Sequence, residues 1–280
     1  MTGREPRRIW LCADDFGISS SVNTAIRDLV VRGRLNATSV LVVAPSFYRS
    51  DAVALNALNS VTQRVAIGLH VALTAPFCPA SKGFTPVRDG AFRPLAATFR
   101  HAALLRFRRD ALVGEIRSQL QTFIDAFGRA PDFVDGHQHV HLLPQVGEAL
   151  LQVVKEMAPD AWVRQCARAI PLAARFADRK GLLLDIFSYR FRRRAAALGV
   201  RTNPAFAGTY EFGNEADFAA LFPRFLEGLP DGSVVMCHPG FVDAELRRLD
   251  PLTTLREKEY AFLASDAFPA LLNARGLALA

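Results

Sequence analysis

Histidine and aspartate residues gather in four short segments, and each segment directly follows a run of apolar residues. Five of the six histidines fall in three of these segments, and two adjacent aspartates form the fourth. A set of carboxylates and imidazoles without cysteine is typical of a catalytic metal site, because it leaves coordination positions open for water and substrate. The residues concerned are Asp14 and Asp15, His70, the group His137, His139 and His141, and His238.

The two adjacent aspartates suggest a division of tasks. If Asp14 and Asp15 were both buried and charged they would repel each other, and a divalent cation beside them would remove that penalty. One carboxylate can then bind the metal while its neighbour, pointing elsewhere, takes up a proton. Capping of the next helix is a weaker interpretation of Asp15, because Ser19 and Ser20 are better placed as N-caps. Gly17 permits a tight turn close to a ligand.

The segments between these polar residues alternate between two patterns. Runs rich in valine, isoleucine and alanine alternate with longer stretches of helical periodicity, which is typical of repeated βα units around a parallel sheet. The predicted strands are Ile9–Ala13, Thr38–Ala44, Val65–His70, Phe133–Asp135, Ala161–Arg164 and Ser233–Cys237. The predicted helices are Ser21–Arg32, Phe47–Asn59, Leu104–Phe127, Gln145–Met157, Ala216–Leu226 and Thr253–Ala264.

The number of βα units favours a closed α/β barrel, a distorted (β/α) barrel of the TIM type, over an open sheet. All strands of such a barrel end on the same rim, so the four polar segments would meet there. No repeat or polar linker divides the chain, and we expect one domain over residues 1–280. Two stretches lack the regular alternation, near 75–95 and 171–214, and we interpret them as insertions that line the site.

The composition favours a folded protein outside the membrane. Half of the 280 residues are apolar, which is enough to bury a large core. The run Ile9–Ala13 is too short for a signal peptide, and the apolar runs fall short of the roughly 20 residues of a membrane-spanning helix. The four cysteines form no CxxC pair, so we expect neither disulfides nor a cysteine zinc site. We therefore expect a cytoplasmic protein.

The positive charge is concentrated in two places. The net charge is +7, with arginine clusters at 106–109 and 190–194 that each enclose a phenylalanine. An aromatic ring flanked by arginines could contact nucleic acid or a lipid headgroup, whereas an amphipathic helix with a solvated basic face is the simpler interpretation. No nucleic-acid-binding motif accompanies either cluster, so we expect no nucleic-acid partner.

Four motifs taken together resemble the YdjC-like carbohydrate deacetylases, a family that includes chitooligosaccharide deacetylase and the hopanoid-biosynthesis deacetylase. The motifs are Ala13–Gly17 (ADDFG), Gly68–His70 (GLH), Asp135–Pro144 (DGHQHVHLLP) and Met236–Gly240 (MCHPG). They occur in the family's order and at comparable spacing. The stretch 171–214 matches no family motif, which leaves the size of the substrate open.

This resemblance implies a distorted TIM-type barrel that holds one divalent metal ion, Zn²⁺ or Mg²⁺. The implied metal ligands are Asp15, His70 and His137. The resemblance also implies that Asp14 is the catalytic base and His238 the catalytic acid.

Four further residues are expected around the substrate or behind the metal ligands: Phe16, His139, His141 and Arg164. The spacing of the clustered histidines allows two geometries. In an extended backbone His137, His139 and His141 share a face, whereas in a helix only the first and last of them do.

The predicted reaction is hydrolysis of the acetamide of an N-acetylglucosamine-containing substrate, with release of acetate. Phenylalanines and arginines in or near the irregular stretches favour an amphiphilic glycolipid, such as a hopanoid precursor, and a soluble chitooligosaccharide is the second candidate. The phenylalanines are Phe77, Phe84, Phe92, Phe187, Phe191, Phe206 and Phe212. A lipid-linked substrate would bring the protein into peripheral contact with the inner membrane surface.

Two other classes of protein remain open at this point. Metal-dependent phosphoesterases and sugar isomerases also carry His and Asp on a barrel rim, although an isomerase usually needs a further carboxylate, for which only Asp135 is well placed. A non-enzymatic barrel that binds lipid or nucleic acid through 190–194 would leave the grouped histidines unexplained. The oligomeric state is not predicted.

Overall fold

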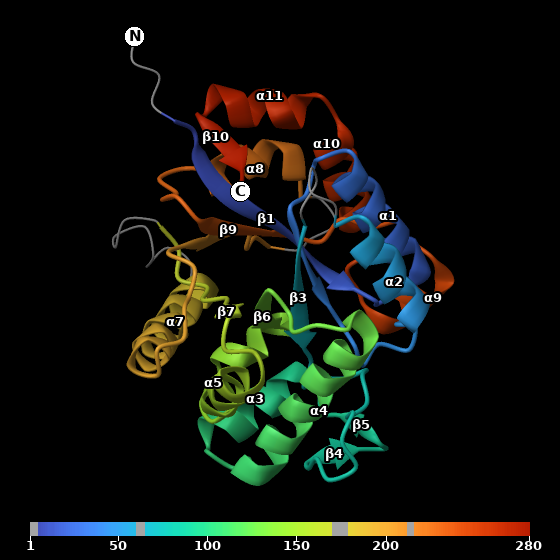
Figure 1. Ribbon diagram of the computed structural model, residues 1–280, viewed down its shortest axis with the longest axis vertical. Coiled ribbons are helices and arrows are strands. Elements are labelled where there is room, and N and C mark those ends of the chain that lie inside the picture. Colours follow the sequence, from blue (N-terminus) through green and yellow to red (C-terminus); the bar gives the residue numbers. More distant parts are fainter. Residues whose placement is uncertain (1–4, 60–64, 170–178, 212–215) are drawn as a thin grey trace.

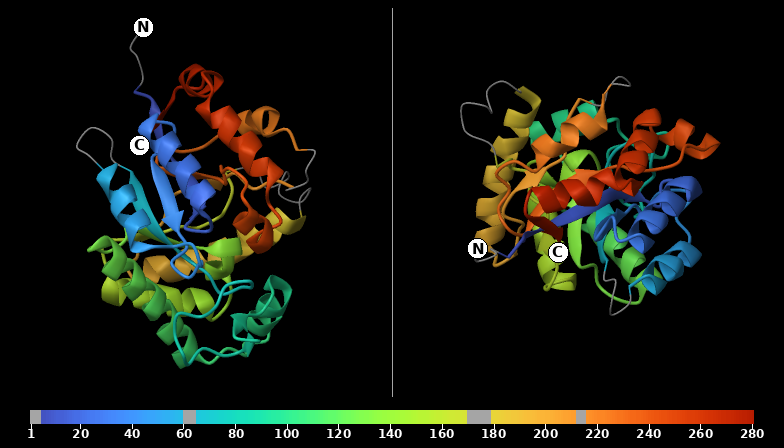
Figure 2. Two further views of the ribbon diagram at one scale, coloured as in Figure 1. Left: turned by 90° about the vertical axis from the view of Figure 1, so that its right-hand side faces the viewer. Right: turned by 90° about the horizontal axis from the view of Figure 1, so that it is seen from above.

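A parallel β-sheet curls through the centre of the structure, and helices surround it (Figures 1 and 2). The computed structural model describes residues 5–59, 65–169, 179–211 and 216–280. The strands of the sheet are β1 (Arg7–Phe16), β2 (Ala37–Val40), β3 (Ala66–Val71), β6 (Phe133–Gly136), β7 (Trp162–Val163), β8 (Phe206–Ala207), β9 (Ser233–Cys237) and β10 (Leu277–Leu279). Their spatial order is β7, β6, β3, β2, β1, β9, β8, and β10 pairs with β1.

The sheet closes on itself through single bridges rather than a continuous ladder. Val163 in β7 pairs with Thr202, and Arg168 pairs with Phe206 in β8, both in the parallel sense. Seven strands and these two bridges therefore form a ring that is irregular between β7 and β8. The predicted distorted (β/α) barrel is confirmed.

All six predicted helices have a counterpart in the structure. They are α1 (Ser20–Val31), α2 (Arg49–Ala57), α4 (Arg109–Phe127), α5 (Val146–Met157), α8 (Phe218–Phe225) and α10 (Thr254–Ala264). The predicted N-cap is also confirmed, because the Ser19 hydroxyl accepts a hydrogen bond from the Val22 N–H at 3.3 Å. No helix in the described parts of the chain is long and apolar enough to cross a membrane.

Two predicted boundaries differ from the structure by four residues or more. The helix predicted from Leu104 begins only at Arg109, because Leu105 has a φ of 52°, which an α-helix does not accommodate. A separate helix, α3 (Leu95–Ala103), precedes this turn. The strand predicted at Thr38–Ala44 ends at Val40, after which the chain enters a turn.

The prediction of an irregular insertion at 171–214 is wrong for the part that the structure describes. Residues 170–178 and 212–215, which include Phe212, lie outside the described residues. The remainder contains a 19-residue helix, α7 (Arg179–Ala197), followed by β8. The stretch 75–95, in contrast, holds little regular structure beyond the two-residue strands β4 (Val87–Arg88) and β5 (Ala91–Phe92).

Other elements were not predicted from the sequence. They are the 3₁₀-helix η1 (His137–Leu142), α9 (Ala244–Leu249), α11 (Ala267–Ala274) and β10. The phenylalanines of the irregular stretches are mostly core residues: Phe77, Phe84, Phe92, Phe191 and Phe206 are buried and Phe187 is half-buried. These rings therefore pack in the core, and they do not form an exposed apolar surface for a lipid.

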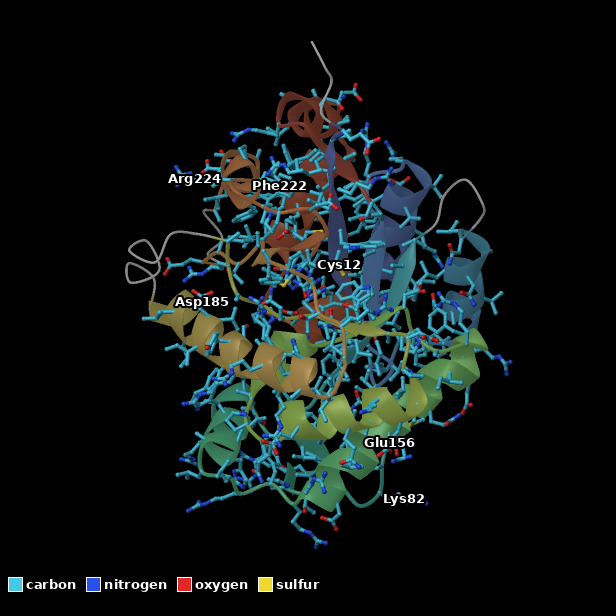
Figure 3. All side chains as sticks on the ribbon, turned by 60° about the vertical axis from the view of Figure 1, so that its left-hand side comes forward. Cys12, Lys82, Glu156, Asp185, Phe222 and Arg224 are labelled. Atoms are coloured by element: carbon cyan, nitrogen blue, oxygen red, sulfur yellow. The ribbon has the colours of Figure 1, made fainter. Side chains whose placement is uncertain are left out.

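The cysteines form no disulfide in the structure. Figure 3 shows Cys12 in the interior of the barrel, whereas Lys82 and Glu156 lie on the outside. All four cysteines are free, and only Cys78 is exposed.

Gly68 in β3 lies beside the aromatic ring of Phe133 in the neighbouring strand β6. A Cβ at this position would lie 2.4 Å from the Cε2 atom of Phe133, its register partner in β6. Phe133 is held on its other side by Trp162, since their ring centroids are 4.5 Å apart and stacked. The strand that carries His70 therefore requires glycine two residues before the histidine.

We expect Gly68→Ala to lower the free energy of unfolding by about 1–3 kcal/mol, because the added methyl group overpacks the core. The thermal unfolding midpoint measures this loss. Gly114→Ala in α4 is the matched control: its Cβ meets no atom within 4 Å, and alanine favours the helix by roughly 1 kcal/mol, so the midpoint should not fall. An unchanged midpoint in Gly68→Ala would contradict this account.

Candidate active site

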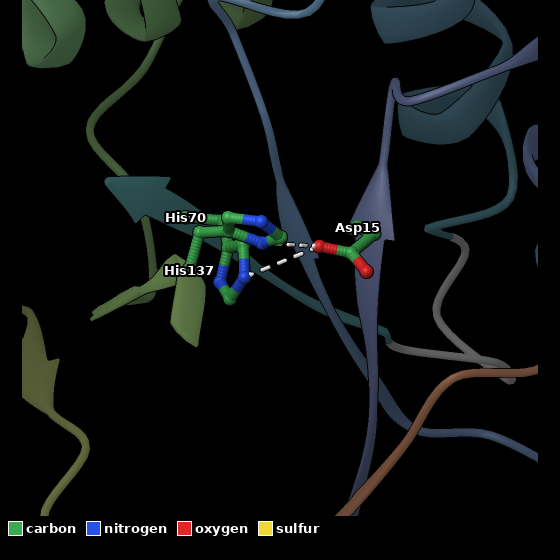
Figure 4. A group of neighbouring side chains, drawn as sticks. All are labelled: Asp15, His70 and His137. Atoms are coloured by element: carbon green, nitrogen blue, oxygen red, sulfur yellow. Dashed lines mark hydrogen bonds and ion pairs between the residues drawn. The ribbon is translucent and has the colours of Figure 1, made fainter. Parts of the chain in front are cut away.

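Three side chains from separate strand ends converge inside the barrel (Figure 4). His137 Nδ1 lies 3.0 Å and His70 Nε2 lies 3.4 Å from the same oxygen, Oδ1 of Asp15. One ligand atom from each residue lies within 4.8 Å of the other two, and all three residues are buried. The structure therefore brings together the three residues predicted as metal ligands.

The end of β1 has an unusual backbone. Successive side chains of a regular strand point to opposite faces, so Asp14 and Asp15 would not both enter the barrel. Asp15 has a left-handed φ of 69°, and the register between β1 and β2 shifts at this point. Gly17 has a φ of 102°, and a Cβ there would lie 2.9 Å from a backbone oxygen. The irregular strand end turns both carboxylates inward.

A buried carboxylate orients His70 from behind. His70 Nδ1 lies 2.6 Å from Oδ1 of Asp135 and 3.0 Å from the hydroxyl of Ser39, so Nε2 is the ring nitrogen that faces Asp15. Burial lowers the pKa of His70, but Asp135 outweighs this effect and raises the pKa to about 10. Such a carboxylate fixes the ring orientation of a metal-binding histidine and makes it more basic.

A fully buried arginine holds Asp15 from the other side. Arg256 Nη2 lies 2.6 Å from Oδ2 of Asp15 and 2.8 Å from Oδ2 of Asp250. Burial raises the pKa of Asp15, yet Arg256 and the neighbouring histidines outweigh this and hold the pKa well below its usual range. Asp15 therefore stays ionised, with Oδ1 turned towards the two imidazoles.

A second buried arginine holds Asp14. Arg164 binds both carboxylate oxygens of Asp14, at 2.7 and 2.6 Å, and also lies 2.6 Å from Asp135 and 3.0 Å from Cys12. Cys12, Asp14 and Asp135 are close enough to hold a metal ion, but the guanidinium already fills the space between them. Burial raises the pKa of Asp14, whereas Arg164 outweighs it and keeps the pKa low.

The other two clustered histidines lie behind the three candidate ligands, and one of them contacts Arg164. Neither predicted geometry of the cluster is observed, because Gln138 and His139 have left-handed φ angles of 52° and 57° inside η1. His141 is fully buried and its Nε2–H donates to the carbonyl oxygen of Arg164 at 2.9 Å. His139 contacts the Cys166 sulfur, and burial lowers its pKa to about 3.

His238 follows β9 and is anchored through its backbone. Its N–H donates to the carboxylate of Glu259, which also accepts a hydrogen bond from the Tyr210 hydroxyl at 2.5 Å. Burial raises the pKa of Glu259 to about 7 and lowers that of His238, whose charge interacts with both Asp14 and Asp15.

Two other predicted residues lie in supporting positions. Phe16 is fully buried at the end of β1, and its carbonyl oxygen accepts the Leu41 N–H. Arg164, predicted only as a substrate or supporting residue, neutralises two carboxylates. Sequence reasoning missed Arg256 and Glu259, which lie within a helix of mixed polar sequence that has no motif to mark them.

The donor set fits a divalent metal ion. Two imidazole nitrogens and one carboxylate oxygen, with no thiolate, leave coordination positions open, as in catalytic zinc sites. Two of the three candidate ligands are backed by a further group: Asp135 on His70 and Arg256 on Asp15. Together, the closed parallel barrel and the buried site at its strand ends define a barrel protein with a candidate catalytic metal centre.

Comparison with known proteins gives the family. The profile of YdjC-like proteins matches residues 8–274, and the chain belongs to this family. Chitooligosaccharide deacetylase of Citrobacter koseri is 29% identical over 243 residues, which cover 84% of this chain and 82% of the relative. The Salmonella schwarzengrund protein of the same name is 28% identical over 270 residues, covering 94% of this chain and 93% of that protein.

Two solved structures share the fold. An Enterococcus faecalis protein, provisionally described as a cellobiose-phosphate cleavage protein, has a TM-score of 0.74 at 21% identity and covers 99% of this chain and 97% of its own. A peptidoglycan N-acetylglucosamine deacetylase has a TM-score of 0.50 at 12% identity, with 98% and 85% covered. At these identities the likeness concerns the fold alone.

We expect Arg256→Met to weaken binding of a divalent metal by about 10–100-fold, because Asp15 loses the group that orients its carboxylate. Chelator competition measures the affinity, and a thermal melt with and without Zn²⁺ checks that the variant folds. Arg248→Met, at an exposed position of α9, is the control and should bind metal normally. A folded Arg256→Met protein with native metal affinity would rule out this role.

Proposed function

We propose that this protein is a metal-dependent carbohydrate N-deacetylase that hydrolyses the acetamide of an N-acetylglucosamine-containing substrate. The observation that carries the proposal is the convergence of His70 and His137 on one oxygen of Asp15, directly beside the ion-paired Asp14. The names of the relatives from Citrobacter and Salmonella support the same reaction class.

The proposed metal ligands are Asp15, His70 and His137. Two imidazoles with one carboxylate suit zinc better than magnesium, which prefers oxygen ligands, so we favour Zn²⁺. A divalent ion bound there supplies a water of lowered pKa and polarises the acetyl carbonyl.

Asp14 is the proposed catalytic base. Arg164 holds both of its oxygens and keeps it ionised, so the carboxylate can accept a proton from the attacking water. Asp14 and Asp15 have different arginine partners, which lets one carboxylate move a proton while the other stays on the metal.

His238 is the proposed catalytic acid. An amine is a poor leaving group and must be protonated as the C–N bond breaks. The Glu259 carboxylate fixes the backbone of His238. Burial lowers the pKa of His238, and the charges of Asp15 and Asp14 offset part of this lowering. These contacts support the delivery of a proton by His238 to the departing sugar nitrogen.

Two classes of molecule are candidates for the substrate that carries the amino sugar. A chitooligosaccharide is supported by the names of the relatives. An N-acetylglucosaminyl lipid, such as a hopanoid precursor, is favoured by exposed apolar residues that lie among arginines on α7 and after α3. A lipid-linked substrate would place the protein at the inner surface of the membrane.

We expect the native protein to release acetate from N-acetylglucosaminides, and to stop doing so when a chelator removes the metal. Asp14→Asn should retain stoichiometric metal and lose at least about 100-fold in kcat, since a positioned base contributes roughly 10²–10⁴-fold. His70→Ala is the contrasting variant and should lose metal and activity together.

The measurement is acetate release from chitobiose and from a lipid-linked N-acetylglucosaminide, with metal content determined in parallel. A metal-loaded native protein that releases no acetate from either compound would defeat the deacetylase proposal. If Asp14→Asn loses its metal, the roles of the two aspartates are exchanged.

We expect His238→Ala to slow amide hydrolysis far more than hydrolysis of an activated acetyl ester, whose leaving group needs no proton. The native kcat should fall as the pH rises and His238 loses its proton, and this alkaline limb should disappear in the variant. Equal losses on the amide and the ester would instead indicate that His238 positions the sugar.

A further inference from the structure

The outward face of α7 combines large apolar side chains with arginines. Ile186 is 46% and Tyr189 is 61% exposed, and Leu183 lies one turn before Ile186 on the same face. Arg190 is exposed beside them, and the Arg193 guanidinium lies over the Tyr189 ring, 5.9 Å from its centroid. The water-facing side of this helix is therefore apolar and positively charged.

The turn that follows α3 has the same character. Leu104 and Leu105 are 52% and 64% exposed, and exposed Arg100, Arg106 and Arg108 lie around them. Leu105 has a left-handed φ of 52°, a conformation in which a bulky residue is rare. The backbone therefore presents two adjacent leucines to solvent at some conformational cost.

The two segments belong to one surface. Phe99 of α3 and Phe187 of α7 make an edge contact with ring centroids 6.0 Å apart. The α3 turn is fastened to the start of α5, because the backbone of Phe107 exchanges two hydrogen bonds with the Gln145 side chain. Arg194 of α7 pairs with Glu148 in the same part of α5. We call the exposed residues of 95–109 and 183–194 the α3–α7 surface.

The charged side chains of this surface are mainly positive. Its arginines are Arg100, Arg106, Arg108, Arg109, Arg190, Arg192, Arg193 and Arg194. Among the described side chains of α7 the one carboxylate is Asp185, which is buried and paired with Arg168. The neighbouring exposed carboxylates, Asp110 and Glu148, each pair with one of these arginines.

We propose that the α3–α7 surface docks on an anionic lipid bilayer. Apolar side chains between arginines fit the boundary between headgroups and acyl chains, where the apolar groups enter and the guanidinium groups meet phosphates. A second copy of the chain is a poorer occupant, because a symmetric interface would bring arginines against arginines.

The α7 helix that carries half of this surface also contacts the candidate site through its buried side. Phe191, on the buried side of α7, packs edge-on against His141 with 5.8 Å between ring centroids, and His141 holds the backbone of Arg164. A chain of contacts therefore links the helix of the docking surface to Arg164. The proposal stands apart from the deacetylase assignment, because vesicle binding is measured without turnover.

The test is sedimentation of the full chain with vesicles. We expect binding to vesicles of equal parts phosphatidylcholine and phosphatidylglycerol, little binding to phosphatidylcholine alone, and release by high salt. Arg190→Glu with Arg193→Glu should lower the partition coefficient at least about tenfold. Leu105→Ser with Ile186→Ser should lower it by a similar factor while the charge is kept. Thermal unfolding checks that both variants fold.

The matched control reverses two exposed arginines elsewhere, Arg224→Glu with Arg275→Glu. Figure 3 shows Arg224 on α8, projecting from the molecule well away from α7, and this control should bind like the native protein. Equal binding of all variants, or no binding of the native protein to anionic vesicles, overturns the proposal. A native dimer that becomes monomeric in Leu105→Ser with Ile186→Ser overturns it too, because the surface would then join two copies.

Discussion

The adjacent carboxylates of Asp14 and Asp15 are both buried in the barrel and need positively charged partners. The arrangement of the other side chains in the site depends on the arginine that pairs with each of them. An ion taken out of water costs several kcal/mol unless it is paired. Arg164 pairs with Asp14 from 150 positions away in the chain, and Arg256 pairs with Asp15 from 241 positions away. Arg164 occupies both oxygens of Asp14, whereas Arg256 occupies one oxygen of Asp15. The remaining oxygen is the one on which the two imidazoles converge. The different arginine contacts therefore distinguish the proposed metal ligand, Asp15, from the proposed base, Asp14.

One helix supports both sides of this arrangement. Arg256 and Glu259 lie one turn apart on α10, a spacing that places them on the same helix face. The first holds the carboxylate of Asp15 and the second holds the backbone of His238. The proposed ligand Asp15 and the proposed acid His238 come from opposite ends of the chain, and α10 fixes their relative positions because it contacts both.

The sequence predicts the location of the site better than its internal connections. Strand ends of a parallel barrel share one rim whatever their loops do, so Asp15, His70 and His137 could be brought together from their places after apolar runs. The partner of Asp15 could not be predicted, because Arg256 lies in a polar helix where local pattern does not separate a buried arginine from an exposed one. The left-handed turn at Asp15 was equally hidden, since no glycine marks it.

The helix α7 could not be predicted for a related reason. Its packing also accounts for the irregular part of the barrel between β7 and β8. β7 has only two residues, so the backbone beyond it needs other partners. Side chains on the inner face of α7 supply them: Ser188 accepts the N–H of Cys166 and Asp185 accepts that of Arg168. A helix with polar residues on its buried face lacks the apolar stripe that reveals helices in a sequence. These side chains replace a longer strand ladder between β7 and β8, where only single bridges join the two segments. Arg164 lies directly after β7 and is held there between Asp14 and Asp135.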